Sequence, residues 1–202
     1  GPTWVFRVPA RDGAADTSAN AHLDVNGDGF DDIVAAAPLA SLDGRSRCGV
    51  VRIYHGGAAG PSPTPSLVLA GAAAGDAFGW TVESAGDING DGYGDVLIGA
   101  PLADAAPGAD AGAVSVYLGS AAGLATTPAT VISGDIAGVQ RGGTVAAAGD
   151  INRDGYDDIA IGATVITPRS IISTGSVAVY RGSATGLDSG SMQSIGGAGV
   201  ND

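Results

Sequence analysis

The chain has 202 residues and a formal net charge of −12. Apart from two histidines it has only nine basic residues, and all nine are arginine. This balance excludes nucleic acid as a partner, because binding to phosphates needs basic patches. No apolar stretch of about 18 residues is present, which excludes a membrane-spanning helix, and the 35 glycines, single glutamate and missing lysines predict an all-β fold.

The first predicted element is a strand at the N-terminus, Trp4 to Arg7, which has the pattern of the last strand of a preceding unit. From residue 17 onward, one pattern of elements occurs three times at a fixed interval of 63 residues. A fixed interval of this length is typical of repeat architectures. We therefore expect one domain, with residues 1–16 holding an extra outer strand and a linker.

Each unit contains four predicted strands, with an acidic loop between the first two and a Gly/Ala/Ser-rich connection between the second and third. The third strand alternates apolar and other residues with a period of two and ends in a tyrosine. In chain order, the predicted strands are Ser18 to His22, Ile33 to Ala37, Val50 to Tyr54, Leu67 to Ala70, Thr81 to Ala85, Val96 to Ala100, Ala113 to Tyr117, Thr130 to Ser133, Thr144 to Ala148, Ile159 to Ala163, Ser176 to Tyr180 and Met192 to Ile195. Four short strands with Gly-rich turns predict a β-propeller blade, so residues 17–72, 73–135 and 136–202 are expected to form three blades.

The acidic loops share the pattern D-x-N-x-D-G-x-x-D, which places side-chain oxygens at positions 1, 3, 5 and 9 and a turn-forming glycine at position 6. Ca²⁺ takes six to eight oxygen ligands in flexible geometry, and one such loop supplies most of them, including the backbone carbonyl of position 7. We expect three Ca²⁺ ions. The predicted ligands are Asp24, Asn26, Asp28, Phe30 (carbonyl) and Asp32; Asp87, Asn89, Asp91, Tyr93 (carbonyl) and Asp95; and Asp150, Asn152, Asp154, Tyr156 (carbonyl) and Asp158.

A simple turn, an EF-hand and a magnesium site each fit the acidic loops less well. Asp, Asn and Gly are good turn formers, but turns alone do not account for four matched oxygen positions in three loops. An EF-hand needs an acid at position 12 and flanking helices, whereas that position holds Ala35, Ile98 and Ile161. Mg²⁺ demands a tighter octahedron and keeps its waters. Asp31 and Asp157, at position 8, are expected to face solvent.

The units resemble FG-GAP repeats, the blades of the integrin α-subunit propeller. The middle unit carries the pattern best, with Phe78-Gly79, the acidic loop and Gly99-Ala100-Pro101, whereas the third has Arg141-Gly142 in place of the first pair. The resemblance implies calcium loops on the lower face of a propeller. It also implies that partners bind the opposite face, through the loops between strands two and three and between successive blades.

Two functions are compatible with the sequence. The first is a secreted or cell-surface scaffold or adhesion module, with a protein or glycan as its ligand. The alternative is the propeller portion of a secreted enzyme, with its site on the face opposite the calcium loops. The connections that would line that face are Leu39 to Cys48, Leu102 to Ala111 and Val165 to Thr174, and none contains a histidine. Because catalysis needs convergent acid, base or nucleophilic groups, we expect no enzyme. The Ala-, Gly-, Asp- and Arg-rich composition suggests a bacterial source.

Three remaining features concern packing and closure. The lone Cys48 and the recurring tyrosines are expected to be packing residues, and so is Trp80. Propellers close with about four to eight blades, so the three blades must belong to a longer propeller or be completed by a second chain. We expect a homodimer that forms a six-bladed ring. In that ring Trp4 to Phe6 would displace Met192 to Ile195 from the outer edge of the last blade.

Overall fold

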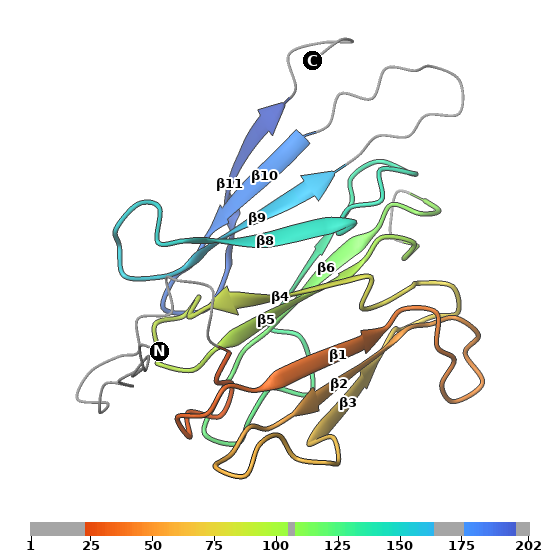
Figure 1. The fold of residues 1–202 in the computed structure, drawn as a ribbon. Coiled ribbons are helices and arrows are strands. Elements are labelled where there is room, and N and C mark those ends of the chain that lie inside the picture. The colour runs from red at the N-terminus through yellow and green to blue at the C-terminus, as the bar shows by residue number, and fades with distance from the viewer. Residues whose placement is uncertain (1–22, 105–107, 164–175, 197–202) are drawn as a thin grey trace, which may run out of the picture.

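The computed structural model describes residues 23–104, 108–163 and 176–196, which form eleven strands in three antiparallel sheets (Figure 1). The first sheet has the order β1 (Ile33–Ala37), β2 (Val50–Tyr54), β3 (Leu67–Ala70). The second has the order β4 (Thr81–Gly86), β5 (Asp95–Ala100), β6 (Ala113–Tyr117), β7 (Thr130–Ser133). The third contains β8 (Thr144–Gly149), β9 (Asp158–Ala163), β10 (Ser176–Arg181) and β11 (Asp188–Gly196), again in chain order.

The all-β prediction is confirmed, and the three sheets are consistent with three FG-GAP propeller blades. In every sheet each strand pairs with its neighbour in the chain, as a blade requires. The predicted strands at residues 4–7 and 18–22 lie outside the described residues, so ring closure and the extra N-terminal strand stay predictions. Among the described residues no helix has the length and apolar character needed to cross a membrane.

The last strand is longer than the sequence pattern predicted. Met192 to Ile195 was expected, but β11 begins at Asp188, and its start pairs with Arg181 across a register shift in β10. The segment from Asp188 to Ser191 contains only polar residues and glycine, so it has no apolar alternation from which a strand could be predicted. In the single chain β11 therefore occupies the outer edge of the third sheet, and its expected competitor, residues 4–6, lies outside the described part of the chain.

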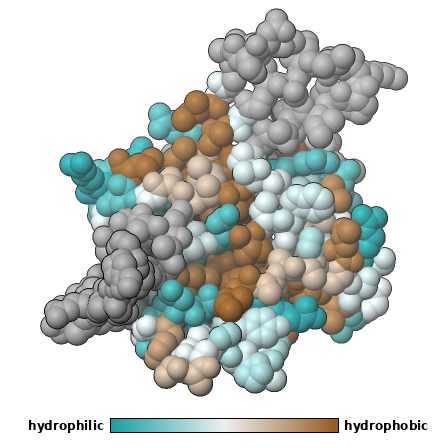
Figure 2. Space-filling model, viewed as in Figure 1, coloured by the Kyte–Doolittle hydropathy of each residue, from teal (hydrophilic) through white to brown (hydrophobic). Residues whose placement is uncertain are grey.

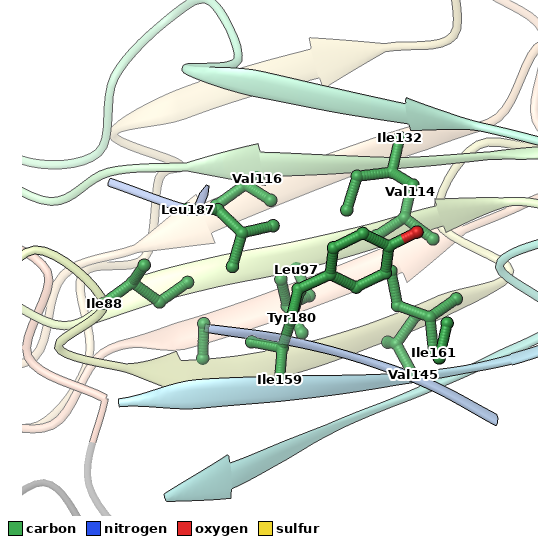
Figure 3. Packing of buried hydrophobic residues seen from close by; sticks show 12 residues of the cluster. Ile88, Leu97, Val114, Val116, Ile132, Val145, Ile159, Ile161, Tyr180 and Leu187 are labelled. Carbon is green, nitrogen blue, oxygen red and sulfur yellow. The ribbon is translucent and has the colours of Figure 1, made fainter. Parts of the chain in front are cut away.

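The hydrophobic core is divided between the two gaps that separate successive sheets. Leu97, Val114 and Tyr180 belong to the cluster between the second and third sheets, and Figure 3 shows the Tyr180 ring among side chains from both. A second cluster, containing Ile53 and Tyr117, fills the gap between the first and second sheets. Burial of apolar surface between sheets is thus the main force that stacks them.

Alternation along the third strands decides which side chain enters which gap. In β6, Val114 and Val116 face the third sheet while Tyr117 faces the first. Tyr117 and Tyr180 are buried, as predicted for packing residues, whereas the third recurring tyrosine, Tyr54, is half-buried. Cys48 is fully buried as small filler. The view of Figure 2 shows hydrophobic residues gathered in the middle of the visible face, with hydrophilic residues on its flanks.

Candidate metal sites

The three acidic loops lie on one side of the stacked sheets. The first precedes β1, the second joins β4 to β5, and the third joins β8 to β9, all on the left in Figure 1. β4 and β8 each contain a register shift close to their ends, and the last pairs before the loops are Gly86 with Asp95 and Gly149 with Asp158. The second and third loops therefore each start from a defined point at a strand end.

Inside each loop the side chains of positions 1, 3 and 5 are turned toward the loop's own backbone. In the second loop the Asp91 amide donates to Asp87 Oδ1 at 3.0 Å and to Asn89 Oδ1 at 3.4 Å. Asp87 Oδ2 accepts from Gly92 at 2.7 Å, and Asp91 Oδ1 accepts from Tyr93 at 3.1 Å. The oxygens of positions 1 and 3 thus accept from the same amide group.

The first and third loops repeat these hydrogen bonds. Asp24 accepts from the amides of Asp28 and Gly29 at 3.1 and 2.9 Å. Asp150 accepts from Asp154 and Gly155 at 3.1 and 2.9 Å. Because the same bonds form in all three units, these hydrogen bonds follow from the sequence pattern that the loops share.

The aspartate at position 9 fastens each loop to its own sheet. Asp95 accepts from the amide of Ile88 through Oδ2 and from that of Gly119 through Oδ1, both at 2.8 Å. Asp32 and Asp158 accept from the corresponding residues, which are Val25, Gly56, Ile151 and Gly182, at 2.8 to 3.0 Å. Sequence reasoning assigned these aspartates only as ligands and missed this role. The signal for it was a glycine that recurs two positions after each third-strand tyrosine.

Burial makes several of these carboxylates hard to ionise. Burial raises the pKa of Asp95 to about 8, opposed by its two backbone hydrogen bonds and assisted by the nearby charges of Asp87 and Asp91. Burial likewise raises the pKa values of Asp32, Asp87 and Asp158. A divalent cation beside these groups would favour their charged forms and offset the cost of desolvation.

The donor set fits a hard cation. Every candidate ligand is an oxygen, from carboxylates, an amide side chain and a backbone carbonyl, which is the chemistry that Ca²⁺ prefers. Within the described residues no three His, Cys, Asp or Glu side chains are grouped as metal ligands. A site in these loops must therefore include the asparagine oxygen and the position-7 carbonyl beside the acids, and the ligand assignment stays a prediction.

Position 8 differs between the loops, and the expectation for Asp157 was wrong. Asp31 is exposed, as expected, whereas Asp157 is buried. Asp157 Oδ2 accepts from the Asp87 amide at 2.8 Å, and the Asp157 amide donates to the Asp87 carbonyl at 3.1 Å. Asp157 thus ties the third loop to position 1 of the second.

Backbone hydrogen bonds connect the first and second loops to the sheet that follows each of them. The Gly94 amide donates to the Asp24 carbonyl at 2.9 Å. This bond is the equivalent, one repeat earlier, of the bond from the Asp157 amide to the Asp87 carbonyl. At position 2, the Val25 carbonyl accepts from Ser120 at 3.0 Å and the Ile88 carbonyl accepts from Ser183 at 3.1 Å. The acidic loops are therefore part of the contact between sheets, which the sequence pattern did not indicate.

The opposite side of the sheets carries the connections between the second and third strands. Arg45 pairs with Asp43 at 3.5 Å, and Asp104 accepts from the Asp110 amide at 3.1 Å, so these acids serve local turns. The third connection, residues 165–174, lies outside the described residues. Packing in the core or at a seam between units was expected for Trp80. At the start of β4 it is 52% exposed, which contradicts the core and leaves packing at a seam a prediction.

Comparison with known proteins identifies the repeat. The FG-GAP repeat profile matches residues 17–54, 78–117 and 142–180, which together make up more than half of the chain. The chain belongs to the FG-GAP repeat family. Each matched FG-GAP segment contains one acidic loop and the strand that follows it, so the resemblance inferred from the motifs is confirmed.

The FG-GAP repeats are similar in sequence to integrin alpha subunits. Identity is 34% over 148 residues to integrin alpha-5 of Xenopus laevis (69% of this chain, 14% of that protein). It is 35% over 160 residues to integrin alpha-6 of Gallus gallus (75% and 14%) and 36% over 168 residues to integrin alpha-8 of Mus musculus (78% and 14%). The chain thus spans about one seventh of the length of these relatives.

Proposed function

We propose that this chain is a calcium-binding FG-GAP module of a secreted or cell-surface protein, and that it serves as a scaffold or adhesion module rather than an enzyme. The observation that carries the proposal is the repetition of one oxygen arrangement in three loops, with the same internal hydrogen bonds each time. Ca²⁺ would supply positive charge to nine carboxylates that otherwise repel one another.

The residues of each loop have distinct parts in this proposal. Positions 1, 3 and 5 supply side-chain oxygens that already accept hydrogen bonds from the backbone amides of the loop. Position 7 supplies its backbone carbonyl. Position 9 contributes a buried carboxylate whose place is fixed by two amide groups. Calcium sites of extracellular modules have dissociation constants of about 0.1–1 mM, which suits a protein that works outside the cell.

Calorimetric titration with Ca²⁺ tests the metal sites. We expect three ions per chain, and two in Asp91→Asn, because the second loop loses a charged ligand. Asp104→Asn is the matched control, since Asp104 is an acid outside the acidic loops. Chelation should lower the melting temperature of the calcium-loaded protein, because a ligand that binds only the folded state stabilises it. A melting curve unchanged by excess chelator would contradict the proposal.

We propose that the ligand, a protein or a glycan, binds on the side opposite the acidic loops. That side carries the exposed Trp80 at the start of β4, and an exposed aromatic ring is a frequent anchor in binding sites. Calcium-loaded protein applied to glycan and extracellular-protein arrays tests this placement. Trp80→Ala should abolish the array signal while leaving the calcium count at three, whereas an unchanged signal would place the ligand elsewhere.

A further inference from the structure

The second and third acidic loops are joined through a residue that is not a predicted calcium ligand. Asp157 Oδ2 accepts from the Asp87 amide at 2.8 Å, and the Asp157 amide donates to the Asp87 carbonyl at 3.1 Å. Asp87 is position 1 of the second loop and supplies one of its predicted ligands. The Tyr156 ring lies against the same loop, because a Cβ atom on Gly90 would come within 2.9 Å of Tyr156 Cε1. The third loop thus contacts the second at two points.

Asp157 stands between two predicted ligands of its own loop. Tyr156 offers its backbone carbonyl at position 7, and Asp158 offers its carboxylate at position 9. Occupation of the third loop would hold both of these neighbours and would therefore fix the peptide that carries Asp157. A loop that is already held in its bound conformation loses less freedom on binding, so its affinity rises. Asp157 is therefore placed to pass the occupancy of the third loop on to the second.

The contact between the first and second loops lacks this carboxylate. Position 8 of the second loop is Gly94, whose amide still donates to the Asp24 carbonyl at 2.9 Å. The residue before position 1 differs to match. A Cβ atom on Gly86 would collide with the Asp157 carboxylate, so that carboxylate needs a glycine there. The first unit has Leu23 instead, and Leu23 Cδ1 lies 3.3 Å from a Cβ atom placed on Gly94. A leucine side chain thus fills the space that a carboxylate fills one repeat later.

We propose that the second and third loops bind calcium as a coupled pair, whereas the first loop binds separately. The inference rests on the proposed calcium sites and adds Asp157 to them as a positioning residue. Coupling between two binding sites is reciprocal, so occupation of either loop strengthens binding by the other by the same factor. We expect about fivefold, the lower end of the usual range. The reason is that calcium in one loop also reduces the negative potential that attracts calcium to the other.

A calcium titration followed by NMR at each loop tests the coupling. The amides of Gly29, Gly92 and Gly155 each donate to an aspartate of their own loop, so each of these signals reports one site. Asp154→Asn removes a charged ligand of the third loop and should weaken calcium binding by the second about fivefold. Asp28→Asn, the matched change in the first loop, should leave the affinity of the second loop nearly unchanged.

Variants of Asp157 distinguish coupling from an ordinary loss of stability. In Asp157→Ala, the effect of Asp154→Asn on the second loop should disappear, because all predicted ligands of that loop remain but the bond between the loops does not. A merely structural role would weaken the second loop and leave the effect of Asp154→Asn intact, which would overturn the proposal. Asp157→Asn keeps an acceptor oxygen and should retain the coupling.

Exchanging two residues should create the coupling where the chain lacks it. Leu23→Gly combined with Gly94→Asp gives the first two loops the residues of the later pair. In this background Asp28→Asn should weaken the second loop about fivefold, and no such change would overturn the role assigned to these two positions.

The wild type and Asp154→Asn together separate this inference from the proposed function. Calcium binding by all three loops of the wild type, with the second-loop affinity unchanged in Asp154→Asn, would overturn the coupling and spare the proposed function. No calcium binding by the wild type would overturn both.

Discussion

Phe78 and Tyr117 lie edge to face, with their ring centroids 6.4 Å apart and their planes at 73°. One repeat interval later, Arg141 and Tyr180 take the same two positions, and Arg141 Nη1 donates to the Tyr180 hydroxyl at 3.4 Å. Arg141 is buried, and within the described part of the chain its Nε has no hydrogen-bond partner. An aromatic contact in one blade is thus replaced by an incompletely satisfied buried cation in the next.

The substitution Arg141→Phe should therefore stabilise the protein. Replacing a buried charged group by a well-packed apolar one of similar volume is often neutral or favourable, and the second blade shows that a phenylalanine fits this position. We expect the free energy of unfolding to rise by about 1–2 kcal/mol, measured by urea denaturation in saturating calcium. The reverse change, Phe78→Arg, should cost about 3 kcal/mol. Stabilisation by both changes would contradict this account.

The pKa of Asp135 should report the same ion pair. The hydrogen bond from Arg141 Nη2, at 2.8 Å, lowers the pKa of Asp135 below its ordinary value of 3.8. A lowered pKa in the folded state stabilises the protein above the unfolded value, and this contribution disappears as the pH falls through the folded pKa. In Arg141→Phe the pKa should return toward 3.8. A carboxyl-detected NMR titration of both proteins checks the shift.

Asp157, in the third acidic loop, should affect both the stability of the protein and calcium binding by the second acidic loop. Asp157→Ala leaves the Asp87 amide without the acceptor it has now, and a buried unsatisfied donor costs about 1–3 kcal/mol. We expect this loss in the free energy of unfolding, together with weaker calcium binding by the second loop, although Asp157 is not among its predicted ligands. Asp157→Asn keeps an acceptor oxygen and should behave nearly like the wild type. Equal losses in both variants would show that the charge of Asp157, and not its hydrogen bond, matters.

Arg153 should weaken the third loop in two separable ways. It is exposed, stands where the other loops have Gly27 and Gly90, and has a φ of 62°, which is unfavourable for a side chain other than Gly, Asn or Asp. Its charge should reduce calcium affinity by up to about 1 kcal/mol. Arg153→Gln removes the charge only, so it should tighten calcium binding without raising stability in chelator.

Arg153→Gly removes both the charge and the backbone conflict. Calcium affinity should rise as in Arg153→Gln, and the free energy of unfolding in chelator should rise by about 1 kcal/mol at most, since greater freedom of the unfolded chain offsets part of the gain. Calorimetry gives the affinity and urea denaturation the stability. Calcium affinity that is unchanged in both variants would rule out the charge effect.

Local patterns were sufficient to predict most of the fold. The bounds of β1, β3 and β7 are those that the apolar runs indicated, because each run is short, apolar and bordered by glycine or polar residues. The alternation in β6 also predicted a strand, and in the structure its two faces pack in different clusters. The polar start of β11 could not be found in this way, since only its pairing with β10 makes it a strand.

The site was predictable where it depends on its own loop. The spacing of Asp87, Asn89 and Asp91 specifies the internal hydrogen bonds that the structure contains. What could not be predicted depends on residues distant in the chain. Asp31 and Asp157 have the same loop position, yet only Asp157 is buried, because it contacts Asp87 of the preceding unit.

The glycine after each third strand has a consequence for how such a chain can evolve. A Cβ atom on Gly119 would lie 2.8 Å from the Val25 carbonyl oxygen, and one on Gly182 would lie 2.5 Å from that of Ile88, too close for any side chain. Neighbouring units thus approach each other here through main-chain atoms, and each repeat needs only a glycine at this position to make the same contact. A gene duplication that inserts another 63-residue unit would meet the same main-chain partners on both sides. Repeat number can therefore change in one genetic step, while the side chains of each unit diverge later.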